Sequence, residues 1–90
     1  MKRHVSILVS GRVQGVFYRA SAKAKADELR ITGFVQNLND GNVYIEAEGT
    51  DEQLNQFKTW CSSGPPRAHV ESVDIKEGEM QNFTSFAVVR

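Results

Sequence analysis

The stretch Ser10–Arg19, with the sequence SGRVQGVFYR, predicts the first elements of the fold. It joins residues 5–9, where Val and Ile alternate with other residues as in a strand, to a segment whose apolar residues have helical spacing. Gly11 and Gly15 allow the backbone between the two elements to turn sharply and to approach a ligand closely. The sequence therefore predicts a strand, a glycine-containing loop and the N-terminus of a helix, in that order.

The N-terminus of the predicted helix is suited to bind an oxyanion. Its first backbone N–H groups have no partner within the helix, and the aligned peptide dipoles create positive potential there. Arg19 adds a planar fork of donors that fits two phosphate oxygens. The spacing differs from the Gly-x-x-x-x-Gly-Lys-Ser/Thr nucleotide-binding loop. On this pattern alone, an ordinary strand-to-helix connection with a surface arginine is the alternative interpretation.

The next elements follow from the spacing of apolar residues. The predicted first helix has one apolar stripe, made by Tyr18, Ala22, Ala26 and Leu29. Two strands are then predicted, over Phe34–Leu38 and Val43–Ala47, with a tight hairpin turn between them. In that turn Asp40 and Gly41 are expected to supply the positive backbone angles.

A capping box predicts the start of the second helix, with Thr50 as N-cap and Gln53 at the third helical position. The apolar face of this helix consists of Leu54, Phe57, Trp60 and Cys61. Gly64–Pro66 is expected to end it. Two further strands are predicted, one around residues 70–75 whose phase shifts once, as at a bulge, and a final apolar segment, Phe83–Val89, at a sheet edge.

The resulting order is β-α-β-β-α-β followed by one short strand. This order predicts a ferredoxin-like α+β sandwich, with a mainly antiparallel sheet and both helices on one face. The chain has no internal repeat, linker or low-complexity stretch, so residues 1–90 are expected to form a single domain. Because this architecture also occurs in RNA-binding, metal-carrying and regulatory domains, the fold alone does not assign a function.

Composition argues against several classes of protein. The 90 residues include 11 Lys and Arg and 11 Asp and Glu, and this zero net charge argues against a general nucleic-acid binder. No run of apolar residues is long enough to span a membrane, and residues 1–9 do not resemble a signal peptide. The single cysteine, Cys61, is expected to be reduced and structural. We therefore expect a cytoplasmic monomer that binds neither nucleic acid nor membranes.

Two segments together resemble a known family. Gly11–Arg19 resembles the Gly-x-Val-Gln-Gly-Val-x-Phe-Arg signature of the acylphosphatases. Gly33–Val43, with the sequence GFVQNLNDGNV, resembles the Gly-Phe/Tyr/Trp-x-x-Asn-x-x-Asp-Gly-x-Val segment of the same family. Both occur in the order and separation found in the family, and the resemblance spans essentially the whole chain. It implies an enzyme that hydrolyses small acyl phosphates to a carboxylate and inorganic phosphate, without a metal or other cofactor.

The resemblance also implies roles for individual residues. In the family, the arginine of the first segment holds the phosphoryl oxygens and the asparagine of the second holds the attacking water; here these are Arg19 and Asn37. The phosphate-binding backbone N–H groups correspond to Gln14, Gly15, Val16, Phe17, Tyr18 and Arg19. Without the first segment beside it, Asn37 could equally be a strand-end residue that supports the adjacent turn.

Three residues depart from the commonest family pattern. Phe17 stands where many microbial members have glycine, and Tyr18 replaces the usual phenylalanine. Arg30 stands where the family usually has a glycine that ends the helix, and a left-handed conformation there would cost about 1 kcal/mol. None of these changes removes a catalytic group. The principal alternative function is a non-catalytic anion-binding or regulatory module of the same fold, and a protein-interaction domain detached from a larger maturation factor is another.

Overall fold

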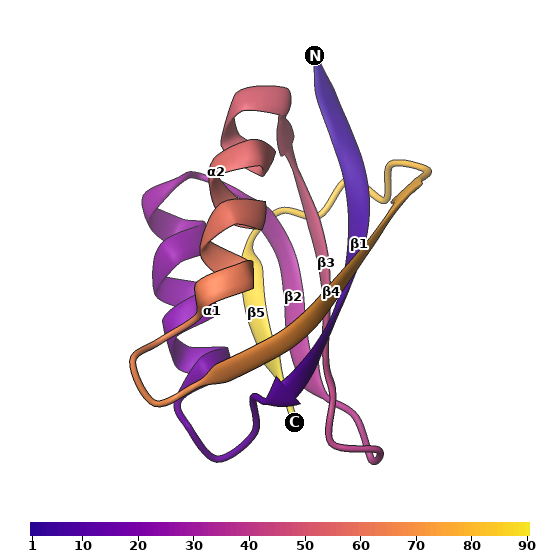
Figure 1. Ribbon diagram of the computed structural model, residues 1–90. Helices are drawn as coiled ribbons and strands as arrows, with labels where there is room; N and C mark the ends of the chain where they lie inside the picture. Colours follow the sequence, from indigo (N-terminus) through magenta and orange to yellow (C-terminus); the bar gives the residue numbers. More distant parts are fainter.

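The helices and strands follow the order predicted from the sequence (Figure 1). A computed structural model describes residues 1–90. Its elements are β1 (Lys2–Arg12), α1 (Tyr18–Glu28), β2 (Thr32–Asn37), β3 (Val43–Thr50), α2 (Asp51–Ser63), β4 (His69–Gly78) and β5 (Phe86–Val89).

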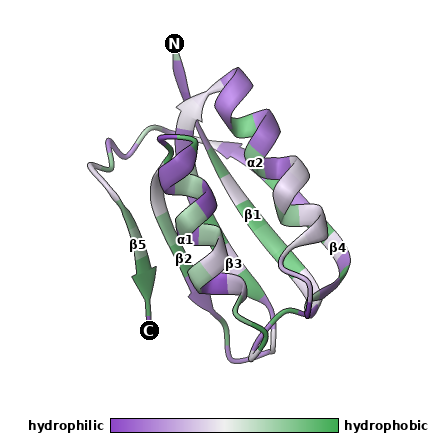
Figure 2. Ribbon diagram, turned by 90° about the vertical axis from the view of Figure 1, so that its left-hand side faces the viewer, coloured by the Kyte–Doolittle hydropathy of each residue, from purple (hydrophilic) through white to green (hydrophobic).

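The five strands form one sheet in the order β4-β1-β3-β2-β5. β1 pairs antiparallel with β3 and β4, and β2 pairs antiparallel with β3. Only β5 runs parallel to its neighbour, β2. Both helices cover the same face of the sheet (Figure 2). The predicted fold class, a ferredoxin-like α+β sandwich with a short additional strand at a sheet edge, is confirmed.

The hydrophobic core lies between the sheet and the two helices. Val5, Ile7 and Val9 of β1 are buried there, as their alternation predicts. The predicted stripe of α1 is also confirmed, because Tyr18, Ala22 and Ala26 are buried and Leu29 is half-buried just after the helix. The predicted capping box of Thr50 and Gln53 is present and fixes the start of α2.

The β2–β3 hairpin differs from its prediction in the turn. The strands end at Asn37 and begin again at Val43, so residues 38–42 form the connection. Gly41 has a φ of +95°, whereas Asp40 has no positive φ. Asp40 acts through its carboxylate instead, which accepts a hydrogen bond from the backbone N–H of Asn42 at 3.0 Å. The expectation of a tight turn with positive angles at both Asp40 and Gly41 is therefore wrong, because the aspartate side chain organises a longer loop.

β4 has the predicted irregularity, whereas β5 is shorter than its predicted segment. The register of β1 against β4 shifts at Ser10/Gly11, which leaves Glu71 without a direct partner and confirms the bulge. Gly11 has a φ of +122° there, and a Cβ atom would overlap the carbonyl of His69, so only glycine fits this position. The final strand begins at Phe86 rather than at Phe83, because Phe83 packs against His4 and Phe34 instead.

The end of α1 is held in a left-handed turn at Arg30, whose φ is +61°. The backbone N–H of Arg30 donates to the carbonyl of Asp27, and that of Ile31 donates to the carbonyl of Ala26. These two bonds form the Schellman motif that commonly ends helices, usually with glycine at the left-handed position. Arg30 thus adopts the left-handed conformation that glycine usually provides, and a residue with a Cβ atom costs about 1 kcal/mol in that conformation.

A buried carboxylate fastens the chain on the other face of the sheet. Glu48 is only 2% exposed, and it accepts hydrogen bonds from His4 Nδ1 at 2.8 Å and from the backbone N–H groups of Gln81 at 2.6 Å and Phe83 at 3.0 Å. Burial acts to raise the pKa of Glu48, but these hydrogen bonds outweigh it and the pKa lies below its ordinary value. Glu48 therefore ties residues 79–85, the connection to β5, to the sheet.

Replacing this carboxylate is expected to destabilise the fold. Glu48→Gln would place an amide NH₂ against N–H donors, and should lower the free energy of unfolding by about 2 kcal/mol near neutral pH. Because the pKa of Glu48 is lower in the folded chain than in the unfolded one, its contribution is present above the ordinary pKa and is lost as the pH falls through the lowered value. Urea unfolding should therefore show a difference between parent and variant that shrinks from about pH 7 to about pH 2.

The matched control is Glu79→Gln, which removes an exposed carboxylate from the same connecting segment. It should change the free energy of unfolding by less than about 0.5 kcal/mol. An equal loss in the two variants, or a loss in Glu48→Gln that does not depend on pH, would show that the buried hydrogen bonds are not the cause.

Candidate active site

The loop between β1 and α1 covers residues 13–17 and is shaped by alternating burial. Val13 and Val16 are buried in the core, whereas Gly15 and Phe17 are exposed. Gly15 and Phe17 both have positive φ angles, of +73° and +68°. The two buried valines anchor the loop, and the left-handed residues turn it toward the N-terminus of α1, where Phe17 is the N-cap.

The backbone N–H groups of this loop are free to bind a ligand. None of the residues Gln14–Phe17 donates a backbone hydrogen bond within the protein. Tyr18 and Arg19 begin α1, so their N–H groups have no carbonyl one turn earlier in the helix to bind. A row of unpaired donors at a helix N-terminus favours an anion. The six N–H groups of Gln14–Arg19 thus lie along the loop and the first turn of α1.

The side chain of Gln14 holds this loop against the β2–β3 hairpin. Its Nε2 donates to the carbonyl of Leu38 at 2.7 Å and to the carbonyl of Asn42 at 2.9 Å. These carbonyls belong to the two ends of the hairpin loop, next to Asn37. The sequence indicated only the backbone N–H of Gln14. The two amide hydrogens of a glutamine could have suggested a bridging role, but the sequence gives no indication of its partners.

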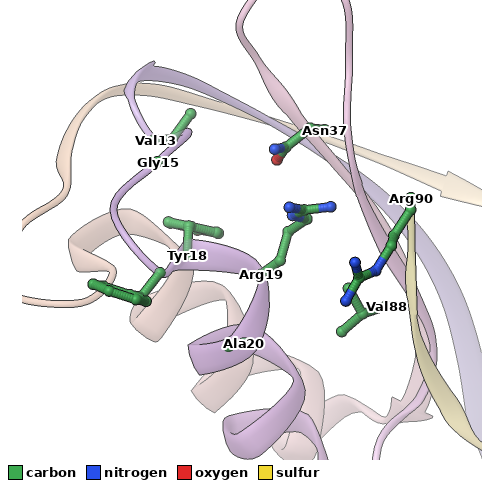
Figure 3. Close-up of a pocket in the computed structure, with 9 residues that line it drawn as sticks. Val13, Gly15, Tyr18, Arg19, Ala20, Asn37, Val88 and Arg90 are labelled. Atoms are coloured by element: carbon green, nitrogen blue, oxygen red, sulfur yellow. The ribbon is translucent and has the colours of Figure 1, made fainter.

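Arg19 and Asn37, the two residues to which the resemblance gives catalytic roles, line the same pocket. The pocket has a volume of about 420 Å³, and its lining includes both side chains together with Gly15 and Phe17. In Figure 3 the side chains of Arg19 and Asn37 point toward each other from α1 and from the end of β2. No acidic residue lines the pocket, whereas Arg19 and Arg90 do. The pocket is therefore suited to an anion.

The two polar side chains have few partners in the protein. The Oδ1 atom of Asn37 is buried and accepts no hydrogen bond. The Nη1 atom of Arg19 lies 3.5 Å from the carbonyl of Val89, a long contact, and Arg19 forms no ion pair. Buried polar atoms normally have a partner, so the Oδ1 atom of Asn37 is available for a group in the pocket. Arg19 is available as well, because its single contact is long.

Tyr18 serves as a structural link rather than as a polar group of the pocket. Its hydroxyl donates to the carbonyl of Cys61 at 2.7 Å, which joins the start of α1 to the end of α2. Burial raises the pKa of the Tyr18 hydroxyl, and burial also raises the pKa of the Cys61 thiol to about 12. The thiol is therefore unreactive, in agreement with the structural role expected for Cys61.

Part of the pocket wall was not predicted. Val88 and Arg90 reach the pocket because β5 pairs with β2, beside Asn37.

No group of three or more His, Cys, Asp or Glu side chains lies where it could hold a metal ion. None of the helices has the length and apolar character needed to cross a membrane.

The sequence model of the acylphosphatase family matches residues 5–88. The chain belongs to the acylphosphatase family. An acylphosphatase of Methylococcus capsulatus is 53% identical over an alignment of 91 positions, which covers 100% of this chain and 98% of the relative. Among solved structures, an acylphosphatase from Coxiella burnetii has a TM-score of 0.95 and 38% identity, covering 98% of this chain and 93% of that one.

An acylphosphatase from Bacillus subtilis has the same TM-score of 0.95, with 33% identity and complete coverage of both chains. Both the fold and the sequence therefore place this chain among acylphosphatases. Membership of this family assigns the chain an activity: it is a hydrolase that acts on acyl phosphates and releases phosphate.

Proposed function

We propose that the pocket between α1 and β2 is the active site, and that hydrolysis proceeds by direct attack of water on the phosphoryl group. The backbone N–H groups of Gln14–Arg19 and the guanidinium of Arg19 bind the phosphoryl oxygens. Asn37 holds the attacking water. The observation that carries this proposal is the placement of Arg19 and Asn37 in one pocket, beside unpaired backbone donors and without any carboxylate.

The chemistry needs no strong acid or base. An acyl phosphate is a mixed anhydride, so the bond from phosphorus to the acyl oxygen breaks to leave a carboxylate, which requires little protonation. The water oxygen forms the new bond to phosphorus, and both of its protons end on the phosphate that is released. Charge stabilisation and positioning then supply most of the catalysis. The proposed reaction does not require a histidine. His4 is buried and hydrogen-bonded to Glu48, on the face of the sheet opposite the helices.

An amide is well suited to hold the water. The carbonyl oxygen of Asn37 accepts a hydrogen bond, and its NH₂ group donates one, so a single side chain fixes both the position and the direction of a water molecule. The unpartnered Oδ1 atom provides such an acceptor. In this mechanism Asn37 orients the nucleophile without removing its proton.

The proposed enzyme acts as a single-domain monomer in the cytoplasm, on small acyl phosphates and without a metal ion. Purified protein should release inorganic phosphate from acetyl phosphate well above the spontaneous rate, and the rate should be unchanged after exhaustive treatment with EDTA. Arg19→Ala prepared in the same way controls for contaminating phosphatases. A rate equal to the spontaneous one would instead favour a non-catalytic anion-binding module, and loss that added metal restores would contradict the metal-free mechanism.

A further inference from the structure

Phe17 combines two unfavourable features at the edge of the pocket. Its φ is +68°, a left-handed conformation that residues with bulky side chains rarely adopt. Its side chain is also 67% exposed, although a phenyl ring is usually buried. A glycine or asparagine would avoid both problems at this N-cap position. Unfavourable conformations of this kind often occur at functional sites, and Phe17 differs from Arg30 in lying at the pocket, so the ring is a candidate for a functional role.

The position of Phe17 suggests that explanation. It lines the same pocket as Arg19 and Asn37, and it follows directly after the unpaired N–H groups of the loop. The guanidinium of Arg67, from the connection between α2 and β4, lies 5.9 Å from the centre of the Phe17 ring. This cation–π contact orients the ring without burying it.

The proposed reaction places the acyl group on the side of the loop. Attack on a phosphoryl group is in line, so the leaving carboxylate departs on the side opposite to the attacking water. Asn37 lies at the end of β2, whereas the loop that carries Gly15 forms the facing wall of the pocket (Figure 3). The organic part of the substrate therefore leaves past the loop, where Phe17 exposes its ring.

We infer that the Phe17 ring is the binding surface for the acyl group and makes the enzyme prefer acyl phosphates with an aromatic or extended apolar acyl group over acetyl phosphate. Such groups stack on an exposed ring, whereas a single methyl group covers little of it. Phe17 is thus a specificity residue. This inference rests on the proposed function of the pocket.

The test compares two substrates in each variant. The parent should have a higher kcat/KM for benzoyl phosphate than for acetyl phosphate, and Phe17→Gly and Phe17→Asn should each reduce this ratio about tenfold. Both replacements accept a left-handed backbone. Because the Phe17 N–H is part of the phosphate-binding loop, any shift of that loop affects both substrates, and its effect cancels in the ratio. Phe17→Tyr keeps the ring and should keep the preference.

Arg30→Gly is the matched control, since it also removes a side chain from a left-handed position, but Arg30 does not line the pocket. It should leave the ratio of the two kcat/KM values unchanged. An unchanged ratio in Phe17→Gly, or an equal loss in Phe17→Tyr, would overturn the inference while leaving the proposed mechanism intact. Failure of the parent to hydrolyse either substrate would instead contradict the proposed function itself.

Discussion

Arg19→Lys is expected to reduce kcat/KM for acetyl phosphate by at least a hundredfold, on the order of the loss caused by removing one well-placed donor to a transition state. Lysine keeps the positive charge but loses the planar fork that binds two phosphoryl oxygens at once. The affinity for inorganic phosphate, measured as its inhibition constant, should fall as well. Both constants come from steady-state hydrolysis of acetyl phosphate.

The fold should survive this change. Arg19 is half-buried, forms no ion pair, and touches the protein through a polar contact of 3.5 Å to the carbonyl of Val89. Arg12→Lys is the matched control, because Arg12 is exposed at the end of β1 and does not line the pocket. Near-normal kinetics in folded Arg19→Lys, or an equal loss in Arg12→Lys, would remove Arg19 from the mechanism.

Much of the fold was predictable because its signals are local. The alternation of Val5, Ile7 and Val9, the capping box of Thr50 and the helical stripe of α1 depend only on residues close together in the chain. The resemblance also marked Arg30 as a position where the family usually has glycine, and the structure has a left-handed turn there. The error in the hairpin turn is also local. Asp40 is compatible both with a positive φ and with a side-chain cap, and only the structure distinguishes them.

The remaining features depend on pairing across the sheet. The antiparallel register of β1 and β3 places His4 opposite Glu48, and the parallel pairing of β5 with β2 brings Val88 to the pocket. The Gln14 bridge likewise requires the hairpin to be in place. These contacts cannot be read from a single sequence, because contacts between segments far apart in the chain depend on strand register. The candidate site residues were identifiable chiefly from the two family-like segments, and their roles remain proposals for experiment.

Asn37→Ala is expected to lower kcat by about a hundredfold or more while changing the inhibition constant of inorganic phosphate by less than about threefold. The loop N–H groups and Arg19 bind the anion without Asn37, whereas the attacking water loses its only proposed positioning group. Steady-state kinetics with acetyl phosphate, with phosphate as the inhibitor, measures both quantities. A group that acts on the nucleophile alone should give this separation between kcat and product affinity.

The competing explanation is that Asn37 supports the neighbouring turn, and the structure offers a control for it. No hydrogen bond joins the Asn37 side chain to the turn, whereas the Asn42 side chain donates to the Asp40 carboxylate at 3.2 Å. Asn42→Ala should therefore lower the melting temperature of the protein and leave kcat near that of the parent. If Asn37→Ala instead loses stability and phosphate affinity together while keeping its kcat, Asn37 is a turn residue and the water must be held by another group. The unpartnered Oδ1 atom inside the pocket favours the first outcome, since a residue that supported the turn would use that oxygen there.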